Sequence, residues 1–96
     1  MPEILKTDEF DEWLSRLADH KAQAKIVSRI ERLGLGNPGD ARPVGEGISE
    51  MRVHRGAGYR VYYKQTGKTI VLLLCGGDKS TQDQDIRRAK QLAAEL

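Results

Sequence analysis

The sequence lacks several features that would place it in a special class of protein. It has one cysteine, Cys75, so no internal disulfide can form and a reducing, cytosolic setting is expected. Its longest apolar run, residues 70–75, is far shorter than the ~18 residues of a membrane span. The first thirteen residues are acidic and have no apolar core of the kind that export signals carry. We therefore expect a cytoplasmic protein with no membrane partner.

A strong charge bias is also missing. Sixteen Lys and Arg residues against fourteen Asp and Glu residues leave a net charge of +2, too small to indicate a nucleic-acid binder by itself. The charges are unevenly distributed, because residues 51–64 contain four Lys or Arg and no acid, whereas acidic residues gather near both ends. This distribution indicates one basic face. With 39% hydrophobic side chains, residues 1–96 are expected to form a single folded domain.

The apolar spacing predicts an α+β fold. A short strand at 3–6 is followed by a helix that begins after Thr7 or Asp8 and by a second helix that ends at Gly34 or Gly36. Residues 34–47 hold five glycines and two prolines and are predicted to be a loop. Strands are predicted at 49–54, 58–64 and 68–75, and a last helix begins near a Thr81–Gln84 or Ser80–Asp83 capping box. The order β-α-α-β-β-β-α predicts an antiparallel sheet with a two-helix layer on one face and a C-terminal helix.

The segment MRVHRGAGYRVYYK, residues 51–64, alternates like two strands around a glycine turn. One set of alternate residues is predicted to pack in the core: Met51, Val53, Tyr59, Val61 and Tyr63. The other set is predicted to form a basic face: Arg52, His54, Arg60, Tyr62 and Lys64. Cations on facing strands repel one another, so an anionic ligand explains this face better than sheet stability does.

A solvated outer sheet face is the alternative interpretation. Against it, the hairpin contains no acid to neutralise its cations. In addition, strand 68–75 is apolar on both faces, so part of the outer face must be covered by the last helix or by another protein. A basic and partly covered hollow is the kind of surface that binds a ligand.

Individual side chains offer candidates for chemistry on RNA. His54 could transfer a proton, because neighbouring cations favour the neutral imidazole, although a structural histidine is the alternative. Tyr62 could stack on a nucleobase or pack as an ordinary aromatic side chain. Lys79 lies beside the turn after strand 68–75 and could reach the basic face. One cysteine and two histidines in separate elements do not indicate a metal site, and no cofactor is predicted.

Two segments, RVHRGAGYRVYY (52–63) and LLLCGGDKSTQDQDI (72–86), followed by RRAKQLAAEL (87–96), resemble the RelE/ParE superfamily of bacterial toxin–antitoxin toxins, and its HigB-like "addiction module killer protein" branch in particular. The resemblance covers essentially the whole chain. It implies a microbial-ribonuclease-like sheet with a helical pair packed on it. It also implies a cognate antitoxin, often of the helix-turn-helix type, through which alone operator DNA is bound. RelE- and HigB-like members cleave mRNA in the ribosomal A site without a metal, whereas ParE-like members inhibit DNA gyrase.

Carried over residue by residue, the resemblance assigns four catalytic residues: His54, Arg60, Arg52 and Lys79. Three more are predicted to bind RNA: Arg55, Tyr62 and Lys64. RelE's catalytic tyrosine near the C-terminus has no counterpart, since the last tyrosine here is Tyr63, and the acids available in that region are Asp83 and Asp85. We expect a metal-independent, ribosome-dependent mRNA endonuclease. The alternatives are a gyrase-inhibiting toxin and a degenerate toxin that only binds its antitoxin.

Overall fold

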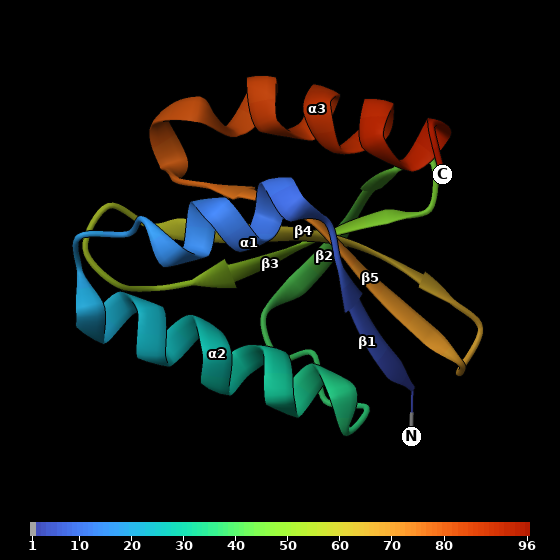
Figure 1. Ribbon diagram of the computed structural model, residues 1–96, viewed down its shortest axis with the longest axis horizontal. Coiled ribbons are helices and arrows are strands. Elements are labelled where there is room, and N and C mark those ends of the chain that lie inside the picture. The colour runs from blue at the N-terminus through green and yellow to red at the C-terminus, as the bar shows by residue number, and fades with distance from the viewer. Residues whose placement is uncertain (1) are drawn as a thin grey trace.

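A five-stranded sheet lies between two layers of helices in the computed structural model, which describes residues 2–96 (Figure 1). The elements follow one another as β1 (Glu3–Lys6), α1 (Asp8–Ser15), α2 (His20–Gly34), β2 (Ala41–Gly45), β3 (Ile48–Val53), β4 (Tyr59–Thr66), β5 (Ile70–Gly77), a 3-10 turn (Lys79–Thr81) and α3 (Gln82–Ala94). Helices α1 and α2 pack on one face of the sheet and α3 packs on the other. The predicted α+β fold with its two-helix layer and C-terminal helix is confirmed.

The sheet has the strand order β1-β5-β4-β3-β2 and is mixed rather than wholly antiparallel. Strand β1 pairs with β5 in parallel, and the other three pairings are antiparallel. The chain between β1 and β5 runs through α1, α2 and the three other strands, and such a long connection allows the two strands to pair in parallel. None of the helices within residues 2–96 is long and apolar enough to cross a membrane.

Strand β2 lies in the segment that was predicted to be a loop, so that prediction is wrong for residues 41–45. Arg42 pairs with Glu50 of β3, and Pro43 pairs with Ser49 before a bulge at Gly45. A proline is compatible with this position because β2 is an edge strand, where one side of the backbone needs no partner. The composition of the segment is that of a loop, and its pairing with β3 makes it a strand.

Side-chain caps fix where α1 and α2 begin. The Thr7 hydroxyl accepts the N–H of Phe10 at 3.0 Å, and an Asp19 carboxylate oxygen accepts the N–H of Ala22 at 3.1 Å. The predicted capping box at α3 is wrong. Thr81 occupies the N-cap position of α3, but its hydroxyl donates to Asp85 Oδ2 at 2.6 Å and caps nothing.

Two hydrophobic clusters hold the layers together. Beneath α1 and α2, the sheet contributes the predicted core residues Met51, Val53, Val61 and Tyr63. Beneath α3, the buried residues are Ile48, Tyr62, Leu74, Cys75 and Ala89. Strand β5 contributes residues to both clusters. This confirms that its two apolar faces are covered, and it shows that the last helix covers the outer face. Burial raises the pKa of the Cys75 thiol to about 12, which keeps the thiol protonated at neutral pH.

Candidate functional site

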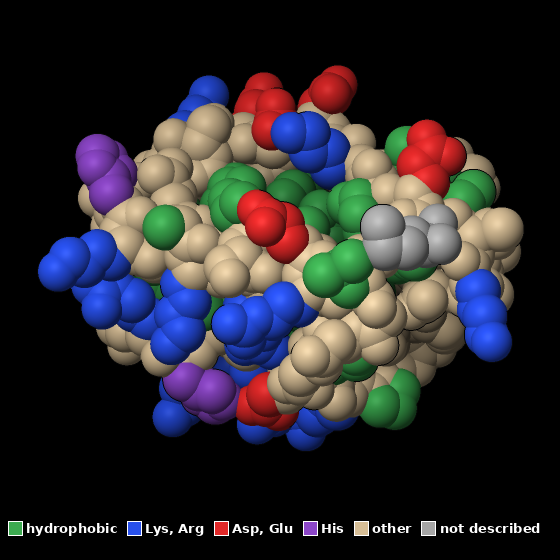
Figure 2. All heavy atoms as spheres, turned by 90° about the horizontal axis from the view of Figure 1, so that it is seen from below, with side chains coloured by type: hydrophobic (Ala, Val, Ile, Leu, Met, Phe, Trp, Pro, Cys, Tyr) green, Lys and Arg blue, Asp and Glu red, His purple; other side chains and the backbone are tan. Residues whose placement is uncertain are grey.

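One pocket brings together five of the seven side chains predicted to act on RNA. It has a volume of about 480 Å³, lies where β3 turns into β4, and its basic lining consists of Arg52, His54, Arg55, Arg60 and Lys79. No Asp or Glu of residues 2–96 is among the lining residues. Figure 2 shows Lys and Arg side chains gathered on the side of the molecule that carries α2, with a histidine beside them.

The other two predicted RNA-binding residues do not reach this pocket. Tyr62 is fully buried beneath α3, so the prediction that it lies on an exposed face is wrong. Alternation correctly placed Tyr62 on the outer side of the sheet, but α3 covers that part of the sheet. Lys64 lies farther along β4, opposite Ile48, toward the other end of the strand.

The register of β3 and β4 places Arg52 and Arg60 directly opposite each other on the same face of the sheet. Arg60 is only 9% exposed, and its Nη1 donates to the carbonyl oxygen of Gly58 at 3.3 Å. Its Nε is buried and has no hydrogen-bond partner within residues 2–96. Two guanidinium groups this close repel each other unless a counter-charge lies between them.

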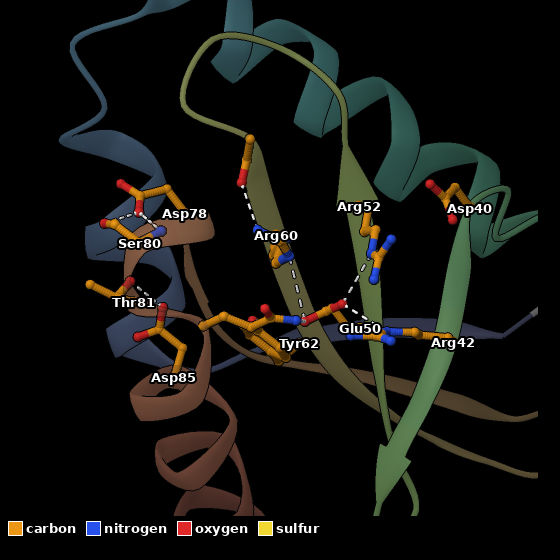
Figure 3. Close-up of polar contacts among 12 residues, drawn as sticks. Asp40, Arg42, Glu50, Arg52, Arg60, Tyr62, Asp78, Ser80, Thr81 and Asp85 are labelled. Carbon is orange, nitrogen blue, oxygen red and sulfur yellow. Dashed lines mark hydrogen bonds and ion pairs between the residues drawn. The ribbon is translucent and has the colours of Figure 1, made fainter.

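Glu50 supplies this counter-charge, and the prediction had overlooked it. Its carboxylate is fully buried, and Oε1 accepts the Nε–H groups of Arg42 and Arg52, both at 3.2 Å (Figure 3). Its Oε2 lies 3.6 Å from Nε of Arg60. The hairpin cations are therefore neutralised in part, contrary to expectation. The sequence did hold a signal, because Glu50 precedes Arg52 by two residues and so shares its face of β3.

Two neutral donors complete the surroundings of Glu50. Its Oε2 accepts the Tyr62 hydroxyl at 3.0 Å and Nε2–H of Gln82, the first residue of α3, at 2.9 Å. Burial acts to raise the pKa of Glu50, but its hydrogen bonds, among them those from Gln82, Arg52 and Tyr62, outweigh burial and bring the pKa below its ordinary 4.5. Glu50 is therefore ionised at neutral pH. Burial and the charge of Glu50 raise the pKa of Tyr62, which keeps its hydroxyl protonated as a donor.

His54 lies at the rim of the pocket, one residue beyond the end of β3, and its side chain is 71% exposed. The strand was predicted to include this residue, but the turn toward β4 begins there. Its Nε2 forms a hydrogen bond with Asp40 Oδ2, and this bond lowers the pKa of Asp40. Arg55 at the same rim pairs with Asp19 at 3.4 Å. Both acids come from segments distant in the sequence, so they could not be foreseen.

Lys79 reaches the pocket from the opposite side, as predicted. Its backbone N–H donates to the carbonyl oxygen of Ala57 at 3.4 Å, so the turn after β5 rests against the turn between β3 and β4. Its ammonium group forms no ion pair with residues 2–96. Among the cations lining the pocket, Lys79 is therefore the one most available to an anionic ligand.

The acids near the C-terminus lie outside this pocket. Asp85 accepts the Thr81 hydroxyl next to Gly77, and burial raises its pKa. Asp83 lines a neighbouring hollow of about 310 Å³ together with Lys79 and Arg87. No three His, Cys, Asp or Glu side chains are grouped as metal ligands within residues 2–96. Among the side chains that line the pocket, the imidazole of His54, the phenol of Tyr59 and the ammonium group of Lys79 are the groups whose chemistry suits proton transfer.

Comparison with known proteins finds a family model that matches the part of the chain containing this pocket. Residues 12–95 match the family model described as "Phage derived protein Gp49-like (DUF891)", a range that contains every residue lining the pocket. The chain is also 55% identical over 94 residues to a protein of Haemophilus influenzae that carries the name "Uncharacterized protein". That alignment covers 98% of this chain and 95% of the Haemophilus protein.

Proposed function

We propose that this chain, which belongs to the Gp49-like (DUF891) family of phage-derived proteins, is the toxin of a type II toxin–antitoxin system and cleaves mRNA on the ribosome. The observation that carries the proposal is the pocket, where five basic side chains meet and no acid of residues 2–96 takes part in the lining. Such a pocket suits a phosphate group. The resemblance of the hairpin and of the segment after it to RelE- and HigB-like toxins makes RNA the proposed source of that phosphate.

The proposed reaction needs a base, an acid and positive charge. The ribose 2′-OH gives its proton to the base, and its oxygen bonds to the adjacent phosphorus. The 5′-oxygen then leaves with a proton from the acid, so that the products carry a 2′,3′-cyclic phosphate and a 5′-hydroxyl. Cations around the phosphate stabilise the negative charge that develops in the transition state.

The pocket side chains divide among these roles. Arg52 and Arg60 hold the phosphate, with Lys79 as a further charge stabiliser and Arg55 as a contact at the rim. His54 accepts the proton of the 2′-OH as the base and, once protonated, is the acid that gives a proton to the leaving 5′-oxygen. When its Nε2–H is donated to Asp40, the lone pair of the neutral ring lies on Nδ1, which is then the proton acceptor. Asp40 thereby fixes the tautomer and the ring orientation.

The proposed partners follow from the same resemblance. They are a cognate antitoxin of the helix-turn-helix type, the translating ribosome with its mRNA, and operator DNA bound only through the antitoxin complex. The proposed location is the cytoplasm. Because the ribosome would position the substrate, the isolated protein should be a weak nuclease.

The proposal is tested by mapping mRNA 5′ ends in cells that lack the antitoxin, after induction of the wild type, His54→Ala, Lys79→Ala and Lys68→Ala. His54 and Lys79 are exposed, so their loss should leave the fold intact. Lys68 is equally exposed but lies in the turn between β4 and β5, outside the pocket, and serves as the matched control. We expect codon-phased cuts with the wild type and Lys68→Ala, and their loss in the other two variants. Unchanged cutting in both pocket variants would contradict the proposed site.

A second function is favoured by one observation, the absence of any tyrosine after Tyr63. Without the C-terminal tyrosine of RelE, the alternatives to a nuclease are a toxin that inhibits DNA gyrase and a degenerate toxin that only binds its antitoxin. Growth arrest with DNA damage and intact mRNA would support gyrase as the target. Full growth after induction of a folded protein would support antitoxin binding alone.

A further inference from the structure

We infer that Glu50 is a positioning residue, which fixes the guanidinium groups of Arg52 and Arg60 in the orientation that stabilises the reacting phosphate, and is itself held in place by Gln82 of α3. The inference rests on the proposed function, because it concerns the same pocket. It assigns Glu50 no contact with the substrate, since the carboxylate is fully buried and does not line the pocket.

The strand register explains why a carboxylate is needed at this position. Arg52 and Arg60 are direct cross-strand neighbours, an arrangement that is unfavourable for two like charges. Glu50 lies two residues before Arg52 on the same face of β3, so it can approach both arginines from the covered side of the sheet. Each carboxylate oxygen faces one arginine: Oε1 accepts the Nε–H of Arg52 at 3.2 Å, and Oε2 lies 3.6 Å from Nε of Arg60.

The contacts with Glu50 leave the ends of the guanidinium groups available. Both arginines turn their Nε toward the carboxylate. Within residues 2–96, neither Nη atom of Arg52 and only Nη1 of Arg60 makes a hydrogen bond. Phosphate is bound best by two N–H groups of one guanidinium at once. This arrangement fixes the Nε side of each guanidinium and leaves Nη N–H groups available to the ligand.

Gln82 and Tyr62 hold the carboxylate in one orientation. Their hydrogen bonds to Oε2 come from α3 and β4, and that from Arg42 to Oε1 comes from β2. A buried carboxylate with donors on both oxygens has little freedom to rotate. Helix α3 is itself tied to α1 through Arg88, which donates to Glu9 at 2.7 Å. The position of the pocket arginines thus depends on how α3 is docked, through Gln82.

Stability alone does not account for this arrangement. Buried ion pairs are often no more stable than well-packed apolar residues of similar volume, so the fold could have used an apolar cluster here. A role in packing alone and a role in positioning make different predictions. If Glu50 only filled space in the fold, a folded Glu50→Gln protein with a side chain of the same shape would keep the arginine geometry. If Glu50 positions the arginines, their geometry is lost although their charge remains.

The test is an NMR measurement of the arginine Nε–Hε signals in the full chain, comparing the wild type, Glu50→Gln and Glu46→Gln. Glu46 is a matched control, because it is an exposed acid paired with Lys90 at 3.7 Å and lies outside the pocket. We expect Glu50→Gln to remove the Arg52 and Arg60 signals from their wild-type positions, and Glu46→Gln to leave them unchanged. Signals of both arginines that stay in place in a folded Glu50→Gln protein would overturn the inference.

A second variant covers the case in which Glu50→Gln fails to fold. Gln82→Ala removes one donor from Oε2 and leaves the carboxylate and both arginines in the chain. We expect a larger shift of the Arg60 signal than of the Arg52 signal, because Oε2 is the oxygen nearer to Arg60. Wild-type signals for both arginines in this variant would also overturn the inference.

A second readout separates this inference from the proposed function. Binding of a 2′-O-methyl RNA oligomer, which cannot be cleaved, and cleavage of ribosome-bound mRNA are measured for the same variants. We expect Glu50→Gln to lower cleavage about tenfold while RNA affinity is retained, because positive charge is kept and orientation is lost. An equal fall in both would contradict a positioning role. If the wild type neither binds nor cleaves RNA, the proposed function fails, whereas the NMR result still decides the role of Glu50.

Discussion

The Glu50 carboxylate is fully buried, so its role follows from the groups that surround it. Two arginine Nε–H groups, one phenol and one amide donate to it, and the Arg60 side chain lies next to it. In this setting the ionised form is the stable one, because all of these groups donate to the carboxylate and a proton on one oxygen would compete with the donors to that oxygen. The charge that keeps two pocket arginines side by side is thus itself maintained by groups from β2, β3, β4 and α3.

This environment predicts a pH dependence of the free energy of unfolding. Hydrogen bonds bring the pKa of Glu50 in the folded protein below the ordinary value of 4.5. A lowered folded-state pKa contributes stability that is present above the unfolded-state pKa and is lost as the pH falls through the folded-state pKa. We expect the wild type to be more stable than Glu50→Gln near neutral pH, and the difference to shrink in acid below the ordinary pKa.

Urea unfolding of the two proteins over this pH range measures the effect. Asp19, Asp40 and Asp78 also have lowered pKa values, but both proteins contain them, so the difference between the curves isolates Glu50. A difference that stays constant from neutral to acidic pH would show that ionisation of Glu50 does not stabilise the fold.

Alternation along the hairpin was enough to predict which side chains share a face. It placed Arg52 and Arg60 together correctly, and it placed Tyr62 on the same side of the sheet. It could not tell that α3 covers Tyr62, because coverage depends on where a distant helix docks. Glu50 was accessible to the same rule and was overlooked because the basic stretch was taken to begin at residue 51.

At the scale of elements, the junction between β5 and α3 requires glycine. A Cβ atom on Gly77 would lie 1.8 Å from Asp85 Oδ2, and one on Gly76 would lie 2.3 Å from the ring of Trp13. These two glycines let α1 and α3 approach opposite faces of the same strand. The segment CGG therefore forms the end of β5 and allows helices to pack closely on both faces of this strand.

Gly77→Ala is predicted to loosen α3. The added methyl group displaces Asp85, and with it the helix that carries Gln82, at a cost of about 1–3 kcal/mol in the free energy of unfolding. Relative to the wild type, amide hydrogen exchange should accelerate more in α3 than in α2. Gly34→Ala is the control, because a Cβ there meets only the Ile4 side chain at 3.4 Å and should cost little. Equal stability of the two variants would show that the contact of α3 with β5 tolerates the methyl group.

The elements differ in how well the sequence predicts them. Helices α1 and α2 have both an apolar stripe and a capping side chain, so local sequence defines them. Strand β2 lacks such a local signal, because Pro43 and Gly45 give it the composition of a loop. Only its pairing with β3 makes it a strand. The parallel pairing of β1 with β5 is likewise a property of the assembled sheet, which no short segment encodes.

Over the whole molecule, a net charge of +2 conceals a separation of charge. The pocket has a basic lining, and cations of α2 extend this basic region while binding its backbone. Lys25 donates to the carbonyl oxygen of His54 at 3.1 Å, and Arg29 donates to that of Arg52 at 2.7 Å. The acids at the rim, Asp19 and Asp40, contact Arg55 and His54 of the pocket, and their negative charge limits the attraction to anions at a distance. RNA binding should therefore depend on local contacts more than on overall charge.

The salt dependence of RNA binding tests this conclusion. For single-stranded nucleic acid, the slope of log K against log salt changes by about 0.7 for each phosphate contact. We expect Arg52→Gln and Lys79→Gln each to reduce the magnitude of the slope by about this amount, because each removes one pocket cation. Lys68→Gln causes the same change in net charge outside the pocket and should leave the slope unchanged. Fluorescence anisotropy with a 2′-O-methyl RNA oligomer at several salt concentrations measures the slopes. If Lys68→Gln reduced the slope as much as Lys79→Gln, binding would follow net charge, and the pocket would not be the RNA site.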